Sequence, residues 1–235
     1  MFFEDKLATL LCEYSLKIKK GDIVEIRGES CAEPLIKSCY KKVLEMGAYP
    51  LVKMSFREQM SYFYKYANEE QLKMVPESVM TAAKTHTALI NIDSEVNTKQ
   101  LSGVDKSKIA LNRNATRVLK DIMFEREAKG EFRWVIAPYP TSAMAQDAEM
   151  DMEEYSKFVF SACKLYEEDP VKAWEKVKTY QENIVKILTG TKTLRILGER
   201  TDLTLNVDGR NWINSCGSHN MPDGEVFTSP VEGSA

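Results

Sequence analysis

The sequence lacks any long hydrophobic run: none of its apolar stretches approaches the roughly 18 residues that a membrane-spanning helix needs. Its first residues, 1–6, also lack a basic segment followed by an apolar one, so we expect no secretory signal peptide. We therefore expect a cytoplasmic protein without membrane contact. Cysteine is sparse, forms no CxxC and occurs an odd number of times, which indicates reduced thiols rather than a disulfide framework. The five cysteines are Cys12, Cys31, Cys39, Cys163 and Cys216.

Several common site motifs are also missing. There is no GxGxxG, no GxxxxGK[ST], no HExxH and no GxSxG, so the sequence gives no support for a dinucleotide, P-loop, zincin or α/β-hydrolase site. Glu29, just after the first expected strand, would oppose a phosphate. We interpret Gly28 in that turn as a simple turn glycine.

Histidine occurs only twice, as His86 and His219. His86 heads an apolar strand, which favours a structural role. His219 lies in a polar, glycine-bearing loop six residues before Glu225, so it is a candidate near a functional site, although its setting favours a purely structural loop role. Cys216 stands three residues before His219 and could form a thiolate pair with it, but nothing in the sequence orients the imidazole.

Negative charge is concentrated at one end of the chain. The net charge of −3 argues against nucleic-acid binding by the whole chain. Residues 200–235 hold two basic and five acidic side chains, so the remainder is balanced. Such a segment suits a cationic partner, either a metal ion or a protonated amine, and it equally suits a solvated loop face.

Strand and helix patterns alternate along most of the chain. This alternation predicts an α/β fold, with a mostly parallel sheet and helices on both of its faces. Proline at the first helical turn and glycine after the last one mark several helix ends, as at Pro34, Gly47, Pro170 and Gly190. We expect strands over 22–28, 48–54, 85–92, 131–137 and 193–197, and helices over 3–20, 34–46, 57–66, 68–84, 104–129 and most of 141–188.

The pattern changes after about residue 190 to short strands and turns. We therefore expect an N-terminal α/β domain over 1–190 and the start of a second domain over 191–235. Asp208–Gly209 lies between two strand-like runs and predicts a hairpin. A second turn, Pro222–Asp223–Gly224, places Glu225 at the first position of another strand-like run, an arrangement suited to aiming one carboxylate from a rigid strand.

The strings RTDLTL at 200–205, GRNWIN at 209–214 and HNMPDGEVFTSPVE at 219–232 resemble the thermophilic-type metalloaminopeptidases, the aminopeptidase T and aminopeptidase S group. The strings GDIVEIR and EMGAYP near the N-terminus follow in the same order. The resemblance implies removal of N-terminal residues from peptides by a two-metal site that uses cobalt, zinc or magnesium. It also implies a cytoplasmic homodimer, and the glutamate of the GEVFT motif, here Glu225, as the first metal ligand.

Members of that group are longer, and their other carboxylate and histidine ligands follow the GEVFT motif. From this we expect the 235-residue chain to be the N-terminal portion of such an enzyme, with the first strands of a truncated catalytic domain, inactive and metal-free on its own. The alternative is a stand-alone α/β binding or dimerisation module without catalytic activity.

Overall fold

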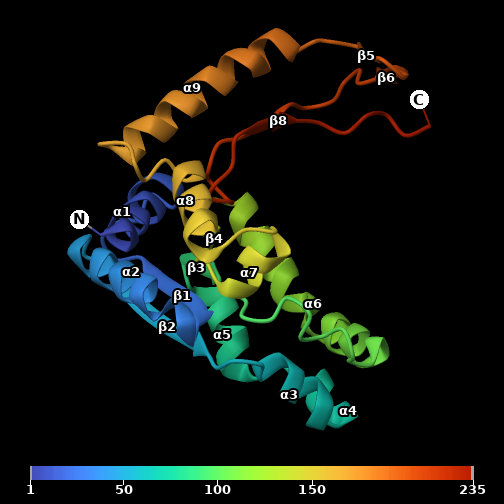
Figure 1. Ribbon diagram of the computed structural model, residues 1–235. Helices are drawn as coiled ribbons and strands as arrows, with labels where there is room; N and C mark the ends of the chain where they lie inside the picture. Colours follow the sequence, from blue (N-terminus) through green and yellow to red (C-terminus); the bar gives the residue numbers. More distant parts are fainter. Residues whose placement is uncertain (1, 234–235) are drawn as a thin grey trace.

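A four-stranded parallel sheet forms the centre of the molecule (Figure 1). The computed structural model describes residues 2–233. The strand order is β2-β1-β3-β4, so the chain reverses its direction of progress across the sheet between β1 and β3. These strands are β1 (Ile23–Glu29), β2 (Tyr49–Ser55), β3 (Ala88–Asp93) and β4 (Arg133–Pro138). The predicted α/β class with a mostly parallel sheet is confirmed.

Helices connect and cover these strands, as the alternating pattern predicts. Side chains at the residue before the helix satisfy free backbone N–H groups at several starts, including Asp105, Asp151 and Asp169. No helix within residues 2–233 has both the length and the apolar character needed to cross a bilayer. The helices are α1 (Phe3–Thr9), a π-helical turn η1 (Leu10–Ser15), a 3₁₀ turn η2 (Ser30–Ala32), α2 (Glu33–Glu45), α3 (Gln59–Tyr66), α4 (Glu69–Lys73), α5 (Glu77–Thr85), α6 (Lys106–Ala128), α7 (Ser142–Asp147), α8 (Met152–Ala162) and α9 (Pro170–Leu188).

Two expected helices differ in the structure. The helix expected over 3–20 ends at Ser15, because Lys17 adopts φ 47° and so turns Leu16 and Ile18 into the core. The helix expected over 68–84 is divided into α4 and α5. Pro76 lies at the break, where its ring disfavours the helical conformation of the preceding residue.

One face of the sheet is apolar and carries the main core. On β1, the alternating side chains of Val24 and Ile26 lie on this face, beside core side chains of the neighbouring strands. They pack with α1, η1 and α2. Gly28 continues this face, where Ile36 and Ile92 approach too closely to leave free space for a larger side chain. The core residues of β1, β3 and β4 are Val24, Ile26, Ala88, Ile90, Ile92, Val135 and Ala137.

The opposite face of β1 carries a buried ionic group. Arg27 Nε donates to Glu25 Oε1 at 2.5 Å, and His86 Nδ1 lies 2.8 Å from Glu25 Oε2. Burial opposes ionisation of Glu25, but the hydrogen bond and charge of Arg27, assisted by His86, outweigh it and lower the pKa of this carboxyl. The structural role predicted for His86 is therefore confirmed.

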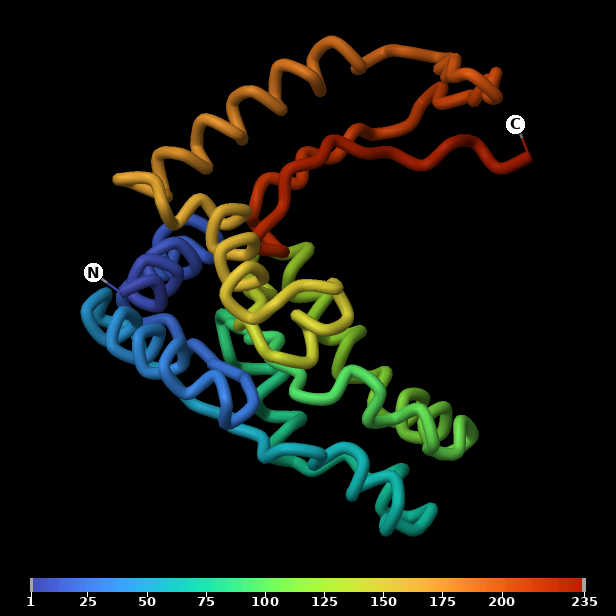
Figure 2. Tube along the Cα trace, viewed as in Figure 1, coloured from blue at the N-terminus to red at the C-terminus, as the bar shows by residue number. Residues whose placement is uncertain are grey.

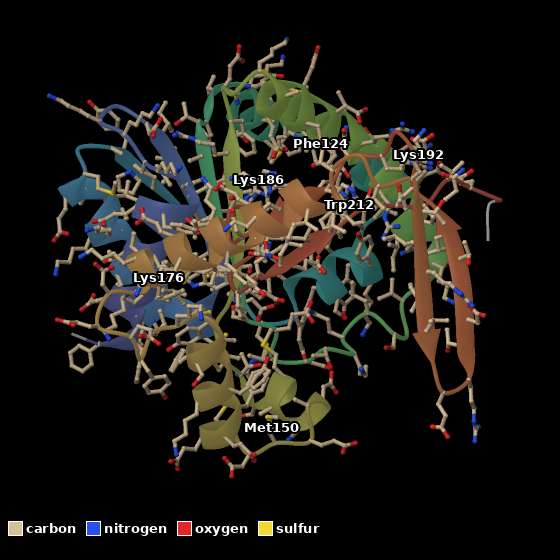
Figure 3. All side chains as sticks on the ribbon, turned by 90° about the horizontal axis from the view of Figure 1, so that it is seen from above. Phe124, Met150, Lys176, Lys186, Lys192 and Trp212 are labelled. Atoms are coloured by element: carbon tan, nitrogen blue, oxygen red, sulfur yellow. The ribbon has the colours of Figure 1, made fainter. Side chains whose placement is uncertain are left out.

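The chain after α9 leaves the sheet and then returns to it (Figure 2). It forms an antiparallel hairpin of β5 (Thr193–Gly198) and β6 (Thr201–Asn206), followed by a short antiparallel pair, β7 (Ile213–Ser215) and β8 (Glu225–Phe227). Figure 3 shows the β5–β6 hairpin standing at the edge of the molecule, with Lys192 near its base. Helix α9 ends at Leu188, close to the expected boundary at 190, and the assignment of 191–235 to a second domain stays a prediction.

The segment between β7 and β8, residues 216–224, is named here the docking loop because it packs back on the α/β unit. The backbone of Ile136 in β4 donates to His219 O at 2.7 Å and accepts from Met221 N at 2.9 Å. This parallel bridge adds a short fifth segment beside β4. The side chain of Met221 is fully buried and belongs to the main core.

We predict that Met221→Ala lowers the free energy of unfolding by about 2–5 kcal/mol, the usual cost of truncating a buried methionine. Met74, which is 60% exposed, is the matched control, and Met74→Ala should cost much less. Chemical denaturation with a common slope for both variants measures the difference. Equal costs for the two variants would contradict burial of Met221 in the core.

We predict that Glu25→Gln lowers the free energy of unfolding at neutral pH. Because the pKa of Glu25 is lowered by folding, its stabilising contribution is present above the ordinary carboxyl value of roughly 4.3 and is lost as the pH falls through the folded value. The deficit of the variant should therefore be constant above about pH 5 and shrink in more acidic solution. Unfolding measured between pH 3 and 7 tests this, and a deficit that grows on acidification would contradict it.

Candidate functional site

Glu225 lies where the sequence places it, at the first position of β8. It pairs across the short sheet with Ser215 of β7. Gly224, at φ 129°, precedes it and donates its backbone N–H to Ser215 O at 3.1 Å. The backbone at Gly224 and Glu225 is thus fixed by its pairing with Ser215 of β7. Its carboxylate is exposed and forms no hydrogen bond or ion pair with the described residues.

The docking loop that leads to Glu225 begins against the first helical segment of the chain. The hydroxyl of Tyr14 in η1 donates to Cys216 O at 2.6 Å. Burial, and next the adjoining Cys216, raise the pKa of Tyr14, so its hydroxyl keeps the proton that it donates. Gly217, at φ 91°, follows at a position where an added Cβ would lie 2.6 Å from Met221 Cε and 3.2 Å from Tyr14 Cε1. Only glycine meets both requirements.

Two further contacts attach β7 to α9, and a third lies within the docking loop. Asn214 Nδ2 donates to Lys178 O at 3.1 Å, and Gln181 Nε2 donates to Ser215 O at 3.4 Å. Within the loop, Asp223 Oδ2 accepts from Gly217 N at 3.2 Å. Asp223, in the Pro-Asp-Gly turn, therefore supports the loop backbone from inside.

His219 is turned toward the α/β unit. Its Nε2 lies 2.7 Å from Glu127 Oε1 in α6, and its ring packs on Trp134 of β4 with centroids 4.8 Å apart. Its side chain is 53% exposed. Cys216 is buried, and its Sγ lies 3.9 Å from Ser218 Oγ. The two members of the conceivable Cys216–His219 thiolate pair thus have different partners.

The described residues supply one carboxylate of the expected metal site but not a complete set of ligands. Within residues 2–233 there is no group of three or more histidine, cysteine, aspartate or glutamate side chains arranged to hold a metal ion. Glu225 suits a hard divalent cation in chemistry, since carboxylate oxygens are common ligands of such ions. One carboxylate does not define a site, so no reaction step is assigned to these residues. The ligand role of Glu225 and a place for His219 near that site stay predictions.

A separate cavity of about 340 Å³ lies at the carboxyl ends of β1, β2 and β3. Open α/β sheets bind ligands at such a reversal of strand order. Here the lining includes Glu29, Asp93 and Glu95. Burial first, and then the charges of Glu95 and Asp93, raise the pKa of Glu29. Arg27 and Lys53 also line the cavity, so its lining combines acidic and basic side chains.

Sequence reasoning missed the residues that hold the docking loop. Tyr14, Glu127 and Trp134 come from a helical segment, the end of another helix and a strand, and each fits an ordinary packing pattern there. No local signal pairs them with residues near 216–219. Only the return of the chain to β4 brings them together.

Comparison with known proteins agrees with this architecture. The family model described as thermophilic metalloprotease (M29) matches residues 4–235. Aminopeptidase 2 of Geobacillus stearothermophilus is 24% identical over 253 aligned positions, which cover 96% of this chain and 60% of that protein. The solved structure of wild-type AmpT from Thermus thermophilus shares the fold, with a TM-score of 0.77 at 23% identity over 97% of this chain and 61% of that one. The chain thus spans about 60% of the length of the relatives it matches. Because the family model covers nearly the whole chain, the chain belongs to the thermophilic metalloprotease (M29) family.

Proposed function

We propose that this protein is a metal-dependent aminopeptidase, which hydrolyses N-terminal residues from peptides at a site that includes Glu225. The observation that carries the proposal is the match of the M29 family model through residue 235, which includes the whole segment from Tyr14 to Glu225. The relative of similar sequence is itself named an aminopeptidase. The carboxylate of Glu225, exposed and without a partner among residues 2–233, is compatible with a ligand role.

In this proposal residues 2–188 form an α/β unit that supports the catalytic domain, and Glu225 is the first of several metal ligands. The remaining ligands would belong to the part of the relatives' length that this chain does not span. Divalent ions such as cobalt, zinc or magnesium, when bound, lower the pKa of a water molecule and polarise a carbonyl group. The contribution of the described residues is to fix the backbone on both sides of the turn that carries Glu225.

The same family assignment supports two further proposals. We place the protein in the cytoplasm as a homodimer that acts on peptides. Light scattering coupled to size-exclusion chromatography tests the dimer.

We predict that the protein expressed from the full reading frame containing residues 1–235 hydrolyses leucyl-p-nitroanilide only with a divalent ion such as Co²⁺. A chelator should remove this activity, and added Co²⁺ should restore it. Residues 1–235 expressed alone should show none, because one carboxylate holds a divalent ion too weakly. Hydrolysis by residues 1–235 alone would disprove the division of the metal site proposed here.

We predict that Glu225→Gln reduces the metal-dependent activity on the order of 100-fold or more, since loss of an outer-shell partner alone costs 10–100-fold. The matched control is Glu199→Gln, which removes another exposed carboxylate, from the turn between β5 and β6, and should keep wild-type activity. An active Glu225→Gln enzyme would show that Glu225 is not a ligand. Inactivity of the wild type under all metals would favour the stand-alone binding or dimerisation module.

A further inference from the structure

Glu127 of α6 contacts one side chain on β4 and one on the docking loop. It lies in the last turn of α6, and its side chain is 27% exposed. Its two carboxylate oxygens have different partners: Oε1 lies 2.7 Å from His219 Nε2, and Oε2 accepts from Trp134 Nε1 at 3.1 Å. The ring of His219 packs on the ring of Trp134. The three side chains form a closed group in which each contacts the other two.

This group rests on a rigid base. Trp134 belongs to β4 and pairs with Leu89 of β3, so its position is set by the central sheet. Because both carboxylate oxygens of Glu127 are engaged, the carboxylate plane is fixed as well. His219 is the only one of the three on a segment that could move without unfolding the sheet. The group therefore acts on the docking loop.

The docking loop transmits this restraint toward β8. Met221 is held two residues beyond His219 by its backbone bond to Ile136, and Asp223 is held by Gly217 N. Gly224 is bonded to Ser215. Between His219 and Glu225, the residues Met221, Asp223 and Gly224 each take part in a hydrogen bond, so a short, attached segment joins His219 to the strand that carries Glu225.

We propose that Glu127 is a positioning residue for the metal site: by holding His219 against Trp134 it favours one docked conformation of the docking loop and thereby sets the direction of Glu225. The inference rests on the proposed function, because it takes Glu225 as a metal ligand. Glu127 itself contacts neither metal nor substrate in this proposal. His219 likewise acts through the loop, with its Nε2 committed to Glu127.

The test uses the protein from the full reading frame with three variants and one control variant. Glu127→Gln removes the charged acceptor, and His219→Ala removes its partner. His219→Gln keeps an amide N–H close to the position of Nε2 and should preserve the bond. Glu125→Gln is the matched control: it removes an exposed carboxylate of the same helix, whose ion-pair partner among residues 2–233 is Lys129 at 3.7 Å. Calorimetry measures the Co²⁺ dissociation constant, and hydrogen exchange follows the amides of Ile136 and Met221.

We predict that Glu127→Gln and His219→Ala raise the Co²⁺ dissociation constant about tenfold, the lower range for loss of an outer-shell partner. Both should also accelerate exchange at the Ile136 and Met221 amides. His219→Gln and Glu125→Gln should stay close to the wild type in both measurements. His219→Gln thus shows whether the effect depends on the hydrogen bond to Glu127 or on the imidazole ring of His219.

Different results overturn different parts of the argument. Faster exchange in Glu127→Gln with an unchanged Co²⁺ dissociation constant would show that the contact only stabilises the fold, and it would overturn the positioning role. Weakened binding in both histidine variants, with Glu127→Gln unaffected, would overturn it by making His219 a direct ligand. Absence of Co²⁺ binding by the wild type would remove the proposed function itself, and the positioning role with it.

Discussion

The burial of Met221 beside Tyr14 and Trp174 is the contact on which the arrangement of the C-terminal strands depends. It brings residues near position 220 into the same core as the first helical segment of the chain. The edge of β4 also gains partners from it, since the N–H and C=O of Ile136 would otherwise face outward. The N-terminal helical segment and the docking loop are therefore parts of one packed unit, although almost the whole chain separates them.

Those features of the fold that follow from local patterns could be predicted from the sequence. Alternating strands and helices indicated a parallel sheet, and Asp169–Pro170 marked the start of α9, where the Asp169 side chain caps the helix. The early end of the first helix before Lys17 and the break between α4 and α5 at Pro76 did not follow from these local patterns. A buried π-helical turn ends the first helix before its apolar pattern ends. Burial of the Leu16 and Ile18 side chains in the core outweighs the local preference for a longer helix.

The candidate site shows the same division between local and tertiary information. A Pro-Asp-Gly turn followed by an apolar run was enough to place Glu225 at the start of a strand. The partner of His219 was beyond reach, because Glu127 is 92 residues away on a helix whose sequence resembles any solvated amphipathic helix. The pairing of a charged residue with a distant loop depends on how the chain returns to β4. The sequence of an edge strand does not indicate which segment will pair with it.

The contacts that attach the docking loop differ in their contribution to stability, so the strong ones keep the loop docked and the weak ones do not. Burial of Met221 contributes about 1.5–3 kcal/mol, and each backbone bond to Ile136 adds about 1 kcal/mol. The half-exposed pair of His219 and Glu127 contributes at most about 1 kcal/mol. Loss of that pair thus leaves the loop docked, because Met221 and Ile136 still hold it. In the positioning role proposed for Glu127, this weak contact favours one docked conformation of the loop, and that conformation sets the direction of Glu225, six residues along the chain. The α/β unit is for this reason more than a spacer ahead of Glu225: its helix α6 and strand β4 hold the docking loop that leads to β8, and α9 contacts β8 itself.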